Sequence, residues 1–283
     1  MIFGFRDFCQ LRDYVYARTG VYIGDQKIYL LKRRIEQRLA TLGLSSVNEY
    51  LNYLKRYDGS GREFEELVCT ITVNETYFFR EFPQLQAFAE FCLPEVVGGK
   101  TSRHVRILSA GCSTGEEPYT ISIICQEMLE PPCTFSIDAL DIDYRALESA
   151  RRGIYDERAV RDVPRVYLEK YFIRTGEGFM VKNNVRDFVT FHKVNLSNRE
   201  ELFALGRSFD FVFCRNVLIY FSDDSRKKVV EAFYAMMNPG GYIFLGHSES
   251  MSRITSAFEL RRMGESLVYR KPLQELNQEW QRF

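Results

Sequence analysis

The chain has 283 residues, 46% of them hydrophobic, and its 38 lysines and arginines equal its 38 aspartates and glutamates in number. This length can bury a sizeable core in one large or two modest domains, and the zero net charge argues against a general nucleic-acid binder. Seven cysteines without a C-x-x-C pair are typical of reduced thiols. Because the sequence has neither a signal peptide nor a long apolar run, we expect a cytoplasmic protein without membrane insertion.

Residues 1–90 predict a small helical domain. The amphipathic stretch Phe5–Thr19 ends at Gly20, which is typical of a helix C-terminus. Apolar residues at helical spacing indicate three further helices, over residues 25–42, 46–57 and 62–72.

The second of these helices carries a stripe of positive charge. Lys27, Arg34 and Arg38 are spaced i, i+7 and i+11, which places them on one side of a helix. A solvated surface is the simpler interpretation, and a docking surface for an acidic partner is the alternative. We assign these three residues to substrate docking as a hypothesis.

From residue 91 to 283, strand and helix signals alternate, which predicts an α/β domain with a doubly wound sheet. Strands are expected at 105–110, 134–140, 187–194, 209–214 and 242–246, followed by an antiparallel pair at 258–261 and 266–270. Helices are expected at 118–128, 144–152 and 223–237. A short hairpin predicts a small β-subdomain at about 171–191.

A glycine loop follows the first strand of this domain. Gly111 and Gly115 are spaced G-x-x-x-G rather than the G-x-G-x-x-G of a dinucleotide site, and Glu116 and Glu117 come next. Two carboxylates would repel a pyrophosphate but not a sulfonium cation, so the loop favours S-adenosylmethionine over NAD. Alternatively, the two glutamates simply complement the helix dipole.

Polar residues follow several predicted strands at the edge where open α/β sheets bind ligands. The second strand ends in Asp141 and Asp143; we assign Asp141 to a ribose and Asp143 to capping the next helix. Asn195 and the pair Arg215-Asn216 stand at two other strand ends.

Five ordered motifs span nearly the whole chain. They are T-x-N-E-T-x-F-F-R at 72–80, S-A-G-C-S-T-G-E-E-P-Y at 109–119, L-D-I-D at 140–143, C-R-N-V-L-I-Y-F at 214–221 and G-Y-I-F-L-G-H-S-E at 241–249. This set resembles the chemotaxis receptor methyltransferases, the CheR family. The resemblance implies a protein-glutamate O-methyltransferase in which an N-terminal all-α domain packs on a Rossmann-like domain that binds S-adenosylmethionine, with no metal.

The resemblance also implies roles for individual residues. Asn74, Thr76, Arg80 and Glu117 would hold the amino-acid end of the cofactor, with Arg80 on its carboxylate. Asp141 would bind the ribose, Asn195 and Leu196 would flank the adenine, and Arg215 and Asn216 would line the pocket floor. Tyr220 would stand beside the transferring methyl group as the catalytic residue.

The partner implied is the cytoplasmic helical region of methyl-accepting chemotaxis receptors. Some family members grip a receptor's C-terminal pentapeptide with a longer turn in the β-subdomain, whereas this chain has only Thr175-Gly176-Glu177-Gly178 there. We therefore expect docking without the tether. Three competing interpretations are a methyltransferase with another acceptor, an NAD oxidoreductase, and a cofactor-binding regulatory scaffold.

Overall fold

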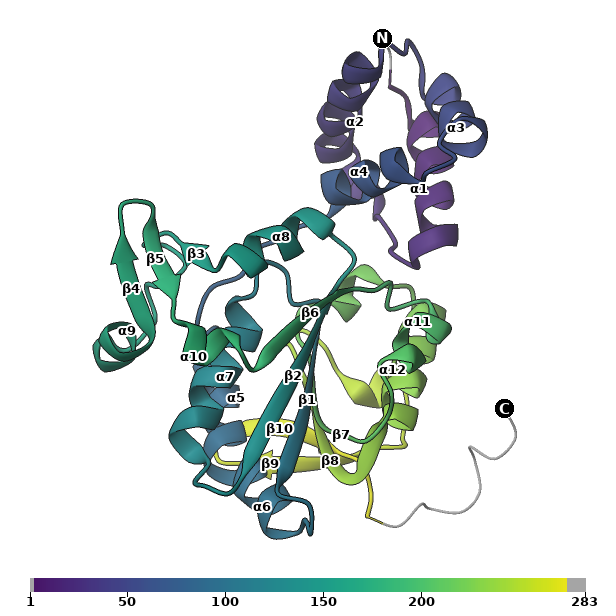
Figure 1. Ribbon diagram of the computed structural model, residues 1–283. Helices are drawn as coiled ribbons and strands as arrows, with labels where there is room; N and C mark the ends of the chain where they lie inside the picture. Colours follow the sequence, from purple (N-terminus) through teal and green to yellow (C-terminus); the bar gives the residue numbers. More distant parts are fainter. Residues whose placement is uncertain (1–2, 274–283) are drawn as a thin grey trace.

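The computed structural model describes residues 3–273, apart from the side chains of Lys27 and Leu30. A helical domain sits at one end of a larger α/β domain, next to the helix α8, and a small separate sheet lies on the other side of α8 in this view (Figure 1). In the described part of the chain, no helix is long and apolar enough to cross a membrane.

The helical domain forms where the apolar spacing predicts it. Its helices are α1 (Phe5–Thr19), the short 3-10 helix η1 (Asp25–Lys27), α2 (Ile28–Leu42), α3 (Val47–Arg56) and α4 (Arg62–Ile71). Gly20 ends α1 in the left-handed region at φ +69°, and the Ser46 side chain caps α3 by accepting from the amide of Glu49. A core of fully buried side chains, among them Phe8, Ile35 and Leu67, holds the helices together.

The α/β domain is built on a seven-stranded sheet in the order β6-β2-β1-β7-β8-β10-β9. The first five of these strands run parallel, and β10 and β9 are antiparallel additions at one edge. Their bounds are β1 (His104–Ala110), β2 (Thr134–Asp141), β6 (Val189–Lys193), β7 (Phe209–Cys214), β8 (Met237–Leu245), β9 (Glu259–Met263) and β10 (Ser266–Arg270). The predicted α/β fold is confirmed, although β8 begins five residues before the expected Tyr242.

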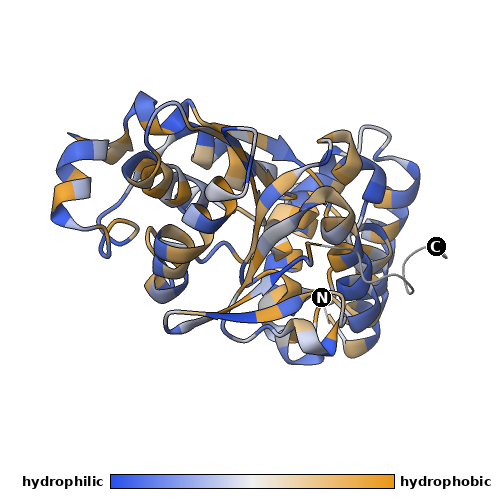
Figure 2. Cartoon of the chain, turned by 90° about the horizontal axis from the view of Figure 1, so that it is seen from below, coloured by the Kyte–Doolittle hydropathy of each residue, from blue (hydrophilic) through white to orange (hydrophobic). Residues whose placement is uncertain are grey.

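Helices cover both faces of this sheet (Figure 1). On one face lie α5 (Phe82–Ala87), the π-helix η2 (Phe88–Cys92), α6 (Leu93–Gly98) and α7 (Glu116–Met128), and on the other lie α11 (Arg199–Ala204) and α12 (Asp223–Met236). The helix α8 (Tyr144–Arg152) follows β2. Figure 2 shows hydrophobic residues along the central strands and hydrophilic residues on the outer helices, the pattern of a sheet buried on both sides.

The segment between the two domains packs against the sheet. Phe88 makes edge-to-face contacts with Phe211 and Phe213 at centroid distances of 5.0 and 5.2 Å. Phe78 and Leu93 belong to the same core cluster. This packing favours a domain division before α5, earlier than the predicted division after residue 90.

The small β-subdomain is a three-stranded antiparallel sheet in the order β3-β5-β4. The predicted hairpin is present as β4 (Phe172–Thr175) and β5 (Gly178–Val181), flanked by α9 (Arg165–Tyr171) and α10 (Asn183–Arg186). The sequence did not predict the third strand, β3 (Ile154–Tyr155), because two residues are too few for a periodic pattern.

Candidate cofactor-binding site

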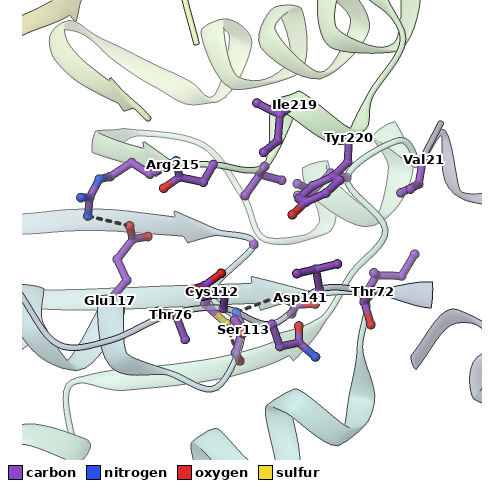
Figure 3. Close-up of a pocket in the computed structure, with 18 of the residues that line it drawn as sticks. Val21, Thr72, Thr76, Cys112, Ser113, Glu117, Asp141, Arg215, Ile219 and Tyr220 are labelled. Carbon is purple, nitrogen blue, oxygen red and sulfur yellow. Dashed lines mark hydrogen bonds and ion pairs between the residues drawn. The ribbon is translucent and has the colours of Figure 1, made fainter. Parts of the chain in front are cut away.

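A cavity of about 360 Å³ opens where β1, β2 and β7 end. The parallel strands bring their carboxyl ends to one edge of the sheet, so residues far apart in the sequence meet there (Figure 3). Every residue predicted to bind the cofactor or act in catalysis lines this cavity: Asn74, Thr76, Arg80, Glu117, Asp141, Asn195, Leu196, Arg215, Asn216 and Tyr220.

The glycine loop forms one wall of the cavity. Gly111 has φ +79°, and a Cβ there would lie 2.3 Å from a methyl carbon of Val217, so a side chain fits neither the backbone conformation nor the space. The Ser113 amide donates to a carboxylate oxygen of Asp141 over 2.7 Å. The Ser113 hydroxyl is buried and has no hydrogen-bond partner within the described residues, although it lines the cavity. Such an orphaned hydroxyl is suited to a polar ligand group.

The two aspartates at the end of β2, Asp141 and Asp143, divide their roles. Asp143 caps α8 by accepting from the amides of Arg145 and Ala146, as predicted. Its other oxygen accepts from the Thr72 hydroxyl at 2.7 Å and the Asn74 amide group at 2.8 Å, which ties the interdomain linker to α8. Asp141 accepts from backbone amides and faces the cavity, and burial raises the pKa of its carboxyl to about 6.

A buried arginine connects the linker with the strand tips. Arg215 pairs with Glu117 at 3.1 Å and with Glu81 at 3.2 Å, and it also donates to the backbone carbonyl of Arg80. Burial raises the pKa of the Glu117 carboxyl, and the Arg215 charge opposes that shift. Sequence reasoning missed Glu81, because its part in this cluster depends on a contact between distant segments.

The linker reaches the cavity through a sharp bend. Phe79 and Glu81, on either side of Arg80, both have positive φ, at +59° and +57°. Arg80 is half-buried and lines the cavity, and its guanidinium donates to the Glu75 carbonyl at 2.7 Å. The bend therefore turns Arg80 toward the cavity that it was predicted to serve.

Tyr220 closes another side of the cavity. It ends the short helix η3 (Leu218–Tyr220), and its ring points into the cavity in Figure 3. Burial raises the pKa of the Tyr220 hydroxyl, so the hydroxyl is protonated at neutral pH. On the adenine side of the predicted site, Asn195 donates to the Arg18 carbonyl over 2.7 Å, and Leu196 is buried.

The helical domain also contributes to the cavity, which the sequence did not predict. Thr19 and Val21 line it, and Val21 pairs with Phe221 in an isolated antiparallel β-bridge. The amide of Tyr22 donates to the carbonyl of Tyr220 over 2.7 Å. No local sequence signal marks these residues, because their role depends on how the two domains pack.

The predicted docking arginines have partners within the helical domain. Arg34 is exposed and donates to the carbonyls of Thr70 and Thr72, at 2.7 and 3.3 Å. Arg38 pairs with the buried carboxylate of Glu63. The side chain of Lys27, the third predicted residue, lies outside the described residues. Of the two described arginines, Arg34 thus presents more of its charge to solvent.

The chain matches two family models that together cover most of its length. Residues 6–72 match the "CheR methyltransferase, all-alpha domain", and residues 74–266 match the "CheR methyltransferase, SAM binding domain". These ranges correspond to the helical domain and to most of the α/β domain.

Curated relatives align along nearly the whole chain. Chemotaxis protein methyltransferase 2 of Vibrio cholerae is 43% identical over 270 residues, covering 94% of this chain and 93% of that protein. Chemotaxis protein methyltransferase 1 of the same organism is 36% identical, covering 94% and 96%, and the chemotaxis protein methyltransferase of Escherichia coli is 34% identical, covering 90% and 87%. The chain belongs to the CheR family of S-adenosylmethionine-dependent chemotaxis protein methyltransferases.

Proposed function

We propose that this chain transfers a methyl group from S-adenosylmethionine to glutamate side chains of methyl-accepting chemotaxis receptors, forming glutamate methyl esters. The cavity at the strand tips carries this proposal, because its residues fit the cofactor. The orphaned Ser113 hydroxyl and the Asp141 carboxylate suit a ribose diol, and the acids Glu117 and Asp141 suit a positively charged ligand.

The predicted site residues would each contact one part of the cofactor. Asp141 would accept from the ribose hydroxyls, while Asn195 and Leu196 would flank the adenine. Asn74, Thr76, Arg80 and Glu117 would hold the amino-acid end, with the Arg80 fork on the carboxylate. Arg215 and Asn216 would form the floor of the cavity. The ion pairs with Glu117 and Glu81 hold the Arg215 side chain in place there.

When bound, the cofactor supplies a methyl group activated by a sulfonium. The acceptor glutamate has an ordinary pKa of about 4.3 and is already ionised at neutral pH, so no residue needs to remove a proton. The protonated Tyr220 would orient the incoming carboxylate and shield the reacting atoms from water. Alignment and exclusion of water are therefore what the protein contributes.

The receptor would dock on the helical domain. Lys27, Arg34 and Arg38 form the proposed basic stripe, with Arg34 its exposed member and Arg38 oriented by Glu63. Charge of this kind attracts and orients an acidic helical segment. The short turn between β4 and β5 supports docking without a C-terminal pentapeptide tether. The free state of all seven cysteines fits the cytoplasmic location of such receptor segments.

The test is incubation of the purified protein with tritiated S-adenosylmethionine and receptor-enriched membranes. We expect label on the receptor that base releases as methanol, and we expect Asp141→Ala to remove most of it. An Asp187→Ala variant, altered at a residue outside the cavity lining, should label like the unmodified protein. Cofactor binding without any base-labile label would overturn the proposal and favour a regulatory scaffold. Base-stable label on the receptor would show that the acceptor group is not a glutamate.

A further inference from the structure

A carboxylate outside the cavity lining holds the turn that carries Tyr220. Glu249 follows β8 and belongs to the last of the five sequence motifs, to which the proposed function gives no role. One of its carboxylate oxygens accepts from the amides of Gly246 at 2.6 Å and Asn216 at 2.9 Å. The other accepts from the amide of Ile219 at 3.2 Å. Three backbone amides thus converge on one side chain.

The backbone is shaped for this convergence. Asn216 has φ +60°, a conformation that asparagine tolerates better than most residues. A Cβ at Gly246 would lie 2.7 Å from the Asn216 backbone nitrogen, so the glycine is what allows the tips of β7 and β8 to approach. Without the Glu249 carboxylate, the part-buried amides of Gly246 and Asn216 would lose these hydrogen bonds, which costs more for a buried donor than for an exposed one.

Glu249 holds one side of the turn, and other residues hold the opposite side. The carbonyls of Leu218 and Tyr220 accept from the Arg226 side chain and the Tyr22 amide, each at 2.7 Å. Glu249 accepts hydrogen bonds from the backbone amides of Asn216 and Ile219, at the start and middle of the same turn. Because Asn216, Ile219 and Tyr220 all line the cavity, a shift of this turn would move the cavity wall where Tyr220 stands.

We propose that Glu249 is a positioning residue for methyl transfer, which it serves by fixing the turn from Asn216 to Tyr220. This inference rests on the proposed function. A glutamine in its place has the same shape, but it presents an NH₂ group where one of the three amides needs an acceptor. Of the residues proposed to bind the cofactor, Asn216 loses a backbone hydrogen bond to Glu249, whereas Asp141 and Glu117 keep their own contacts, so cofactor affinity should fall much less than the rate.

The experiment compares Glu249→Gln and Glu249→Ala with Glu265→Gln, a control at an exposed position between β9 and β10. Three quantities are measured: kcat for receptor methylation at saturating cofactor, the Kd of S-adenosylhomocysteine by calorimetry, and deuterium uptake of peptides covering residues 215–221. For Glu249→Gln we expect kcat to fall about ten- to hundredfold, since misplacement by about 1 Å costs that much. We expect its Kd to change less than about threefold and deuterium uptake to rise. The control should match the unmodified protein in all three quantities. If Glu249→Ala does not fold, the test rests on Glu249→Gln alone.

A double-mutant cycle links the effect to Tyr220. If Glu249 acts through Tyr220, then adding Glu249→Gln to Tyr220→Ala should change kcat less than about twofold. An unaltered kcat in Glu249→Gln, a loss of cofactor affinity as large as the loss of rate, or a full additional loss in the Tyr220→Ala background would each overturn the inference. If the unmodified protein methylates no receptor, the proposed function fails, and deuterium uptake then decides: unchanged uptake in Glu249→Gln would overturn the holding role of Glu249.

Discussion

The backbone amide of Tyr22, just after the first helix, donates a 2.7 Å hydrogen bond to the carbonyl of Tyr220 in the α/β domain. The neighbouring Val21–Phe221 bridge and the 2.7 Å contact between the hydroxyls of Tyr16 and Ser222 extend this junction. The helical domain, proposed to dock the receptor, therefore touches the turn that carries the proposed catalytic tyrosine.

Replacing Gly20 tests this junction. A Cβ at Gly20 would lie 1.9 Å from the Ser197 hydroxyl oxygen, and the backbone there has φ +69°. Gly20→Ala should therefore lower the free energy of unfolding by more than the approximately 1 kcal/mol cost of the left-handed conformation alone. Urea unfolding measures the stability. Calorimetry measures the affinity for S-adenosylhomocysteine, which should also fall because Thr19 and Val21, on either side of Gly20, line the cavity.

Gly43 supplies a matched control for that experiment. It has nearly the same φ, +66°, but a Cβ there meets nothing within 4 Å. Gly43→Ala should show only the conformational cost of about 1 kcal/mol and unchanged cofactor affinity. Equal effects of the two substitutions would contradict the tight contact at Gly20.

The raised pKa of Asp141 predicts how stability depends on pH. Burial raises this pKa to about 6, so the folded protein holds the proton more tightly than the unfolded chain, where the pKa is about 3.9. The contribution of Asp141 to stability is thus complete below about pH 4 and is lost as the pH rises through about 6.

Comparing the unmodified protein with Asp141→Asn isolates this contribution. Between about pH 5 and pH 7.5, the unmodified protein should lose on the order of 1–2 kcal/mol more stability in urea unfolding than the variant. Glu116, whose pKa burial raises to about 7, titrates in both proteins and cancels in the difference. Parallel pH profiles would mean that Asp141 does not titrate in this window.

Arg38 should matter for the stability of the helical domain. Glu63 is buried and accepts from both Arg38 and the Tyr50 hydroxyl, the latter over 2.7 Å. Arg38→Ala leaves this carboxylate without its cation and should lower the free energy of unfolding by about 3 kcal/mol. Arg33→Ala, at an exposed position on the same helix, should stay within about 0.5 kcal/mol in the same unfolding experiment.

Arg34 is the better residue for testing receptor docking. Its side chain is exposed, and Arg34→Glu reverses the charge presented to an acidic partner. The substitution also removes the hydrogen bonds to the Thr70 and Thr72 carbonyls, which should lower the free energy of unfolding by only about 1 kcal/mol. Receptor methylation should fall several-fold, and more so at low ionic strength, with the Kd of S-adenosylhomocysteine unchanged. Arg33→Glu makes the same charge change at the adjacent residue. An equal loss of receptor methylation in that variant would indicate a nonspecific charge effect instead of a docking stripe.

The short β4–β5 turn predicts that tethering is dispensable. Residues 175–178 close the hairpin directly, since Thr175 pairs with Gly178. A receptor C-terminal pentapeptide should give no measurable heat of binding in calorimetry, and receptors truncated by these residues should be methylated at the same rate. Micromolar binding of the peptide would refute this prediction.

Local patterns predicted much of the fold. The strand β7 was evident because five of its six residues are apolar and form one short run. The helix α1 was evident because its apolar spacing ends at a glycine. The two-residue strand β3 and the π-helix η2 have no such signature. The start of β8 was misplaced because Asn238-Pro239-Gly240 is typical of a turn, and in the structure this stretch is an irregularity within β8, where pairing with β7 passes from Met237 directly to Tyr242.

The residues of the candidate site also fall into two groups, those that a local sequence signal predicts and those that depend on contacts between distant segments. Asp141 and Asn216 follow strands, so the rule for parallel sheets placed them together. The roles of Glu81, Val21 and Glu249 could not be predicted, although Glu249 stands in the fifth motif, because each acts through a partner distant in the sequence. Arg38 was expected on an open surface, whereas the packing of α2 on α4 gives it the buried Glu63 as a partner.

Both domains contribute to the walls of the cavity. The helical domain supplies Thr19 and Val21, the linker supplies residues between Thr72 and Arg80, and the α/β domain supplies the strand ends. A chimera that exchanges the amino-terminal helices between relatives would therefore change more than receptor choice. It would also alter the rim of the cavity, so an exchange at this boundary should preserve cofactor binding only between relatives whose loop after the first helix matches.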